Sequence, residues 1–191
     1  MSMIARVAAK AHNAIDVTDW LGSIKPLKKL NYVFAGGSKQ DAIAVADPTA
    51  GYVESNILTF PDNKIYIVAK VTHDFFKAEV IRHTLELVLC NNTVTITRQI
   101  VQSNNQGGVL GHVDTELYAN IPCKIIPAEL SEDKIDDVFL NKYIVYFPSN
   151  MPIEINDKLQ FAHTYSVGKA EGIKLSTLGL QEIYFDKDFR W

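Results

Sequence analysis

The stretch HTLELVLCNNTVTITRQIV, residues 83–101, identifies the fold class most directly. Apolar and polar residues alternate in it, so that Leu85 and Leu87, and then Val94 and Ile96, recur at every second position. A period of two is typical of strands with one buried face, and β-branched residues favour the same conformation. Two asparagines separate the runs, as turn residues do. The stretch therefore predicts two β-strands.

The same pattern continues on both sides of this stretch. NKIYIVAKV (residues 63–71) and YIVYF (residues 143–147) are further strand candidates. THDFFKAEVIRH (residues 72–83) fits a helical stripe as well as a strand, and we favour the strand. Residues 31–191 are thus predicted to be mainly β, as a small antiparallel β-barrel domain. A division of this domain into two β-subdomains near residue 92 remains open.

The first thirty residues have a different pattern. Apolar residues recur at helical spacing in residues 3–15, beginning with Ile4 and Val7, which predicts an amphipathic helix. Gly22 and Pro26 then interrupt a lysine-rich segment without a clear period. We therefore expect residues 1–30 to be an N-terminal helix and arm.

Two stretches resemble each other within the chain. IYIVAKVTHDFFKAEVIRHTLELVLCN (residues 65–91) and TYSVGKAEGIKLSTLGLQEIYFD (residues 164–186) both run aromatic, x, Val, x, Lys, and both continue into an alternating apolar strand. Likeness between strand pairs often arises by chance, so the pattern alone does not establish a repeat.

Composition excludes several classes of protein. The chain has 191 residues, 47% of them hydrophobic and 21% charged, which is typical of a folded domain. A net charge of −3 disfavours extensive contact with nucleic-acid phosphates. Cys90 and Cys123 are expected to be reduced and to pack as small hydrophobic residues. The first residues lack the pattern of a secretory signal, and no apolar run is long enough to span a bilayer, so we expect no membrane contact.

The sequence has few features of a catalytic site. GGSK (residues 36–39) lacks the glycine spacing of a phosphate-binding loop. His112, Asp114 and Glu116 would share one face of an extended strand, which makes them weak candidates for a metal site. Alternating polar residues are also the ordinary solvent face of a strand. We therefore predict no enzyme, no cofactor and no catalytic residue.

The order of motifs near the carboxyl end resembles a known family. ELYANIPCKIIP (residues 116–127), KYIVYFPSNMPIEINDKLQF (residues 142–161), TYSVGKAEG (residues 164–172) and LGLQEIYFD (residues 178–186) follow one another as in the head-closure, or stopper, proteins of tailed bacteriophages. The likeness extends over about residues 57–191. Asn156 stands where that family usually has glycine before Asp157, and asparagine suits a turn that needs a positive φ.

The resemblance implies a structural virion protein of the phage neck. Such a protein joins a homo-oligomeric ring between the portal or adaptor ring and the tail-terminator or tail-tube proteins, closes the DNA channel and docks the tail. It would contact packaged double-stranded DNA only transiently, would lie in the neck of the virion, and would assemble in the host cytoplasm. A tail-terminator or baseplate barrel is the structural alternative. From other classes, a single-stranded nucleic-acid-binding barrel is disfavoured by the acidic balance, and a metal-dependent enzyme would use His112, Asp114 and Glu116.

In this interpretation two loops rich in glycine and amide residues contact the channel or a neighbouring subunit. The first is Asn104, Asn105, Gln106, Gly107 and Gly108; the second is Gly36, Gly37, Ser38 and Lys39. Apolar residues at the two ends of the chain are the candidates for docking on a partner ring. These are Ile4, Val7, Phe185, Phe189 and Trp191. For the carboxyl end, packing on the protein's own barrel is an equal alternative.

Overall fold

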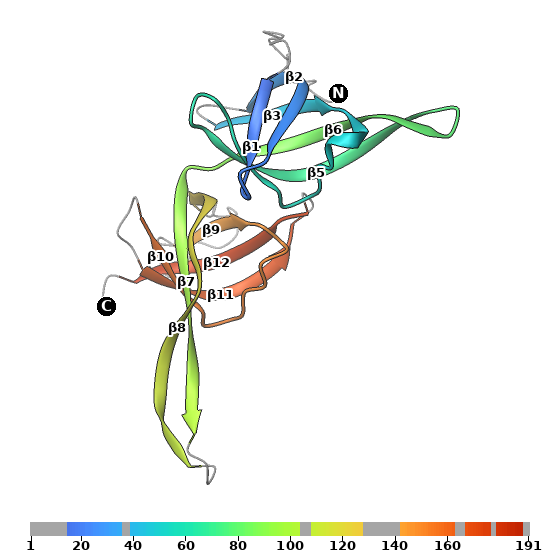
Figure 1. Ribbon diagram of the computed structural model, residues 1–191. Helices are drawn as coiled ribbons and strands as arrows, with labels where there is room; N and C mark the ends of the chain where they lie inside the picture. Colours follow the sequence, from blue (N-terminus) through green and yellow to red (C-terminus); the bar gives the residue numbers. More distant parts are fainter. Residues whose placement is uncertain are drawn as a thin grey trace. The chain divides into compact units, whose positions relative to one another are not determined.

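The computed structural model describes residues 15–35, 39–103, 108–127, 142–162, 167–176 and 179–188 (Figure 1). The first strands are β1 Ile15–Asp19, β2 Ile24–Ala35, β3 Lys39–Ala46, β4 Ile57–Thr59, β5 Ile65–Phe76 and β6 Glu79–Leu89, with the short 3₁₀ helix η1 Pro48–Ala50. The later strands are β7 Asn92–Ser103, β8 Val109–Pro127, β9 Lys142–Phe147, β10 Lys158–Phe161, β11 Val167–Leu175 and β12 Gln181–Asp188.

These strands form two closed barrels rather than one. The first has the order β1-β2-β3-β6-β5-β4 and closes where Thr18 of β1 pairs with Thr59 of β4. The second has the order β10-β11-β12-β9-β8-β7 and closes between β7 and β10. The predicted mainly β, antiparallel barrel fold is therefore confirmed, and the chain contains this barrel twice.

The two barrels share one topology. Adding six to each strand number of the first barrel gives the order β7-β8-β9-β12-β11-β10, which is the order of the second barrel read in the opposite direction. The two stretches that resemble each other in sequence, residues 65–91 and 164–186, contain the equivalent strand pairs β5–β6 and β11–β12. The likeness therefore falls on structurally corresponding strands.

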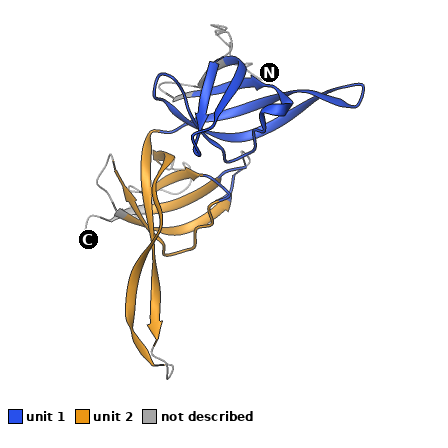
Figure 2. Cartoon of the chain, viewed as in Figure 1, with its two compact units in different colours: residues 1–90, 148–150, 175–180 blue, residues 91–147, 151–174, 181–191 orange. Residues whose placement is uncertain are grey.

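The chain also divides into two compact units (Figure 2). Unit 1 contains residues 1–90, 148–150 and 175–180, and unit 2 contains residues 91–147, 151–174 and 181–191. The boundary between Cys90 and Asn91 lies next to the position near residue 92 at which the sequence left a subdivision open. Unit 1 thus includes two short segments from much later in the chain.

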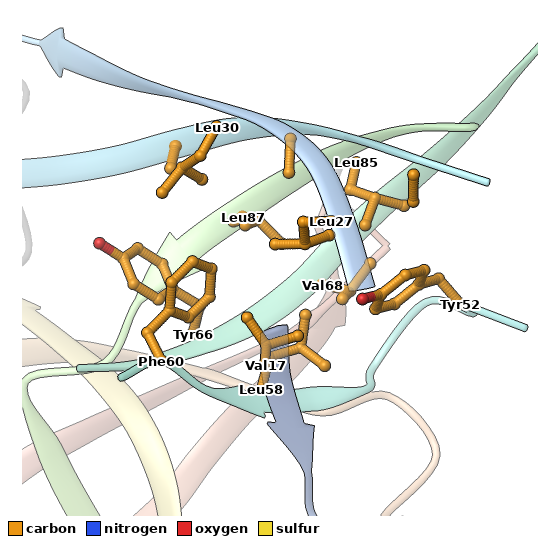
Figure 3. Packing of buried hydrophobic residues seen from close by; sticks show 13 residues of the cluster. Val17, Leu27, Leu30, Tyr52, Leu58, Phe60, Tyr66, Val68, Leu85 and Leu87 are labelled. Carbon is orange, nitrogen blue, oxygen red and sulfur yellow. The ribbon is translucent and has the colours of Figure 1, made fainter. Parts of the chain in front are cut away.

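Side chains from every strand of the first barrel fill its interior (Figure 3). Leu27, Leu30 and Leu85 are fully buried, and the ring centroids of Phe60 and Tyr66 lie 4.7 Å apart. Burying one such side chain contributes about 1.5–3 kcal/mol. The cluster consists of Val17, Leu27, Leu30, Ala42, Ala44, Ala46, Tyr52, Leu58, Phe60, Tyr66, Val68, Leu85 and Leu87.

The expectation of an arm over residues 16–30 was wrong, because this segment forms β1 and most of β2. The register of β2 against β3 shifts between Leu27 and Lys29, which is a β-bulge. The bulge lets Leu27 and Leu30 both point inward although they are three residues apart, so the sequence shows no period of two. Pro26 lies before Leu27, the first residue of β2 that pairs with β3. The N–H that proline lacks is therefore not needed for the hydrogen bonds between β2 and β3.

The late segments of unit 1 are tied to it by specific contacts. Ser149 Oγ lies 2.8 Å from Ser55 Oγ, and its backbone N–H donates to the same oxygen. Gly179 adopts a φ of +70°, and a Cβ there would lie 2.9 Å from the carbonyl oxygen of Ala69. Only glycine avoids both the strained backbone and this clash.

The second barrel is centred on aromatic residues. Phe161 and Phe185 stack with ring centroids 4.9 Å apart, and Tyr143 stacks on Phe185 at 5.5 Å. Val145, Phe147 and the other core residues around them are buried. The predicted helix over residues 3–15 lies outside the described residues except for Ile15, which begins β1.

Candidate interaction surfaces

Two hairpins continue beyond the barrels to which they belong (Figure 1). In the first hairpin, β5 pairs with β4 only up to Ile67, and β6 pairs with β3 only from His83 onward. Residues 75–81, which we call the β5–β6 tip, therefore pair only within the hairpin. This segment was ambiguous in the sequence, and the preference for strand over helix is confirmed.

The second hairpin behaves in the same way (Figure 2). Strand β7 pairs with β10 over Val94–Thr97, and β8 pairs with β9 over Lys124–Pro127. Residues 98–103 and 109–115, which we call the β7–β8 ribbon, have only each other as strand neighbours. Both hairpins therefore carry unpaired strand edges, which the closed barrels lack.

Large apolar side chains are exposed on both hairpins. Phe75 and Phe76 are 64% and 61% exposed at the β5–β6 tip, and Leu110 is 69% exposed on the β7–β8 ribbon. The other exposed members are Val80 and Ile81 at the tip, and Ile100, Val101, Val109 and Val113 on the ribbon. A two-stranded hairpin is marginally stable in water, and exposed apolar patches mark interaction sites. These surfaces are therefore the strongest candidates for protein contacts.

The β7–β8 ribbon exposes apolar side chains on both faces and has no charged residue between Arg98 and Asp114. Ile100 pairs with Val113 on one face, while Val101 pairs with His112 on the other. Residues 99–113 contain no Asp, Glu, Lys or Arg, although 21% of the whole chain is charged. Depletion of charge with exposure of apolar residues is typical of the centre of a protein–protein interface.

A clamp of charged residues lies at the base of this ribbon. Arg98 Nε and Nη2 each donate to a different oxygen of Asp157 at 2.8 Å, and Nη1 donates to Glu154 at 2.7 Å. These bonds raise the pKa of the Arg98 guanidinium above its ordinary value. The Asp157 side chain is only 2% exposed and also accepts from the Glu154 N–H. The clamp fixes the turn before β10 to the strand that leaves the barrel.

Asn156 within this turn has a φ of +76°. The positive φ predicted there from asparagine in place of glycine is confirmed. Asparagine tolerates this conformation better than most residues. The turn thus presents the Asp157 carboxylate to Arg98 without a glycine.

A histidine pair lies at the base of the other hairpin. His73 and His83 are cross-strand partners, and their ring centroids are 4.5 Å apart. His83 is buried, and its Nδ1 atom has no hydrogen-bond partner among the described residues. Burial and the neighbouring His73 lower the pKa of the His83 imidazole, while Asp47 acts in the opposite direction. The pair therefore disfavours protonation of His83.

A third exposed apolar group lies at the β1–β2 turn. Trp20, Leu21 and Ile24 are all exposed there. The Asp19 carboxylate accepts hydrogen bonds from the backbone of Leu21 and Ser23, which fixes the turn. This group was not predicted from the sequence, because the segment lacks a strand period.

The predicted contact residues fall in three classes. Gly108 is described and exposed beside the β7–β8 ribbon, and Lys39 begins β3. Phe185, predicted for docking on a partner, is 2% exposed and stacked inside the second barrel, so that prediction was wrong and its alternative applies. The remaining predicted residues lie outside the described residues. They are Asn104, Asn105, Gln106, Gly107, Gly36, Gly37, Ser38, Ile4, Val7, Phe189 and Trp191.

The weak metal candidates do not form a site. His112, Asp114 and Glu116 are exposed along β8, and the Asp114 carboxylate accepts a hydrogen bond from Lys158 Nζ at 2.6 Å. Across the part of the chain that the structure describes, no three His, Cys, Asp or Glu side chains are grouped to hold a metal. Cys123 is buried as predicted, Cys90 is half-buried, and neither forms a disulfide.

Comparison with known proteins adds no identification, since no family model, curated protein or solved structure matches the chain. None of the described residues forms a helix with the length and apolar character needed to cross a membrane. The two hairpins and the motifs of the sequence are therefore the features that bear on function.

Proposed function

We propose that this chain is a structural component of a tailed-phage neck. It joins a ring between the portal or adaptor ring and the tail, closes the DNA channel and offers a docking surface to the tail. The proposal combines the motif order of residues 57–191 with the two exposed hairpins. It involves no substrate and no chemical step.

The observation that carries this proposal is the β7–β8 ribbon. A ribbon that exposes apolar side chains on both faces and is uncharged over residues 99–113 suits burial between protein surfaces. Apart from Arg98, which binds Asp157 and Glu154, it has no described lysine or arginine that could bind phosphates, so it suits a protein neighbour better than nucleic acid. An arm of this kind can reach a neighbouring subunit or ring, while its barrel remains a rigid wall.

The closed barrels suit a structural subunit of a ring. Each barrel pairs all of its strands in a ring, so the barrels present no open edge that would recruit further strands at random. Contacts are then restricted to the hairpins and loops. A subunit of this kind can assemble in a defined geometry, as a closed ring requires.

A tail-terminator or baseplate barrel is the second candidate, because proteins of those classes use similar barrels. It shares the exposed hairpins and differs in its position in the particle. The position of the protein in the virion therefore separates the two candidates.

The test is electron microscopy of phage particles assembled with and without this chain. Full heads that lose DNA and fail to take tails in its absence, with a ring at the head–tail junction on restoration, are the expected result. Stable, full, tailed particles without it would overturn the neck assignment. Density in the tail or baseplate would establish the second candidate.

A pair of variants connects this test to the ribbon. Leu110→Asp places a charge on the ribbon, and Val53→Asp places one at a similarly exposed apolar site, 57% against 69% exposed. Particles complemented with Leu110→Asp are expected to lack tails, whereas Val53→Asp should restore them. Equal restoration by both variants would exclude the ribbon as the docking surface.

A further inference from the structure

The row of core residues on β5 and β6 ends in two histidines. On the face of the hairpin that packs on the core, Val71 pairs with Leu85, and His73 pairs with His83 two residues further out. Ala46, the last residue of β3 that pairs with β6, lies beside His83 on the other side. The histidine pair therefore lies at the mouth of the first barrel, where the apolar core ends and the hairpin continues alone.

The two imidazole rings lie next to each other. Their centroids are 4.5 Å apart, and their planes meet at 69°. His83 is only 8% exposed, so the surrounding strands fix its ring. His73 is exposed, so its ring can turn about the side-chain bonds while its Cβ remains about 4.5–5.5 Å from that of its partner. The pair thus combines one fixed imidazole with one adjustable imidazole.

The Nδ1 atom of His83 is buried and has no hydrogen-bond partner among the described residues. Buried polar atoms in native proteins nearly always have a partner, so this nitrogen is available to a ligand. Burial and the neighbouring His73 lower the pKa of the His83 imidazole, which keeps the ring neutral at pH 7. A metal ion requires a neutral imidazole. Asp47 contributes negative charge near His83, which favours a bound cation.

We propose that His73 and His83 together bind a divalent first-row transition ion, such as Zn²⁺, at the mouth of the first barrel. Imidazole nitrogen is a preferred ligand of these ions, at about 2.0–2.1 Å from zinc. Tetrahedral geometry then separates the two nitrogens by about 3.3 Å. Rings with centroids 4.5 Å apart reach this separation when the His73 ring turns. Water completes the coordination, because no three His, Cys, Asp or Glu side chains of the described residues are grouped to hold a metal.

The ion fastens β5 to β6 at the point where the hairpin leaves the barrel. Strand β6 pairs with β3 only from His83 onward, and the β5–β6 tip pairs only within the hairpin. A two-stranded hairpin is marginally stable in water, so a link between its strands at the base limits its opening. This site concerns a single chain and does not depend on the proposed function in the phage neck.

Isothermal titration calorimetry of the full chain tests the site, with no affinity tag and after treatment with EDTA. We expect one Zn²⁺ per chain with a Kd below about 0.1 mM. Mg²⁺ should not bind, because it prefers oxygen ligands. In thermal unfolding, free Zn²⁺ at about 100 times its Kd should raise the melting temperature by roughly 5–11 °C.

Substitutions locate the ion. His73→Ala removes an exposed ligand, so the variant should fold like wild type and bind Zn²⁺ at least about 10-fold more weakly. His83→Gln removes the buried ligand and should weaken binding in the same way, and its melting temperature without metal shows whether it is folded. His112→Ala is the matched control, because His112 is the described histidine outside the pair and is also exposed. This variant should bind Zn²⁺ like wild type.

Hydrogen exchange followed by mass spectrometry tests the effect on the hairpin. Zn²⁺ should slow amide exchange in residues 75–81 of the wild-type chain and should leave exchange in His73→Ala unchanged.

Three results would overturn the proposed site. They are no Zn²⁺ binding up to about 1 mM, binding that His73→Ala leaves unchanged, and binding that His112→Ala removes. Exchange in residues 75–81 that stays the same with the ion bound would indicate an adventitious ion only and would overturn the link between β5 and β6.

Discussion

Replacement of Arg98 by methionine should destabilise the protein by about 3 kcal/mol. The change keeps an unbranched side chain of similar length and removes the guanidinium, which donates two 2.8 Å bonds to Asp157 and one to Glu154. The Asp157 carboxylate, 2% exposed, would then remain buried with the Glu154 N–H as its donor within the turn. A buried charge without its counter-ion is costly because water cannot replace the lost partner.

The magnitude follows from the burial of the pair. Removing one partner of a fully buried ion pair costs about 3–5 kcal/mol. The Arg98 side chain is 26% exposed, and one donor to Asp157 remains, so the low end of that range applies. For a chain of this size each kcal/mol shifts the melting temperature by roughly 2–4 °C, which gives a decrease of about 6–12 °C.

Thermal unfolding of the full chain, followed by circular dichroism, measures the effect. Glu154→Gln is the matched control, because Glu154 contacts the same guanidinium but is 69% exposed, and its loss should cost less than about 1 kcal/mol. Asp157→Asn combined with Arg98→Met should cost less than the sum of the single changes, since no uncompensated charge remains. A change below about 0.5 kcal/mol for Arg98→Met would refute the argument that the buried carboxylate depends on Arg98.

Three further predictions concern unit 1. Ala78→Gly should stabilise the chain by about 1 kcal/mol in thermal unfolding, because Ala78 has a φ of 68° that glycine adopts without strain; a lower melting temperature would contradict this. Gly179→Ala should cost at least about 2 kcal/mol, because it adds backbone strain to a contact of 2.9 Å with the Ala69 carbonyl oxygen; an unchanged urea midpoint would contradict it. The pKa of folded His83 lies below its ordinary value of 6.5, so the unfolded chain binds more protons as the pH falls through that value, and the free energy of unfolding should decrease. His83→Phe should reduce this decrease in urea unfolding between about pH 7.5 and 5.5, and an equal slope in both proteins would contradict the assignment.

The strands that the sequence predicts well are those with one face buried in the barrel and the other face toward solvent. Val94 and Ile96 point into the second barrel while Thr95 between them is half-buried, so the alternation is visible in the sequence. The boundary of β2 is hidden because a bulge separates Leu27 from Leu30. The number of barrels is hidden as well, because strand periodicity does not record which strands close on one another.

The candidate sites show a similar limit. The loop at residues 104–108 was predicted as a contact site from its glycine and amide residues. The exposed apolar residues lie instead on the strands beside it. Phe75 and Phe76 are adjacent, and a two-stranded tip exposes both faces, so no period distinguishes them from core residues. Phe185 shows the reverse case, since an aromatic residue near the chain end belongs to the interior of its barrel.

Because unit 1 consists of segments that lie far apart in the sequence, all of its segments exist only late in translation. Residues 148–150 and 175–180 belong to this unit, so the ribosome must reach residue 180 before all of its segments exist. At about 5–20 residues per second, roughly 5–18 seconds separate the emergence of Cys90 from that of Leu180. During this interval neither Ser149 nor Gly179 is available to residues 1–90. The strands of the first barrel are therefore synthesised before residues 148–150 and 175–180, which belong to the same unit. A fragment ending at Cys90 lacks these two segments permanently.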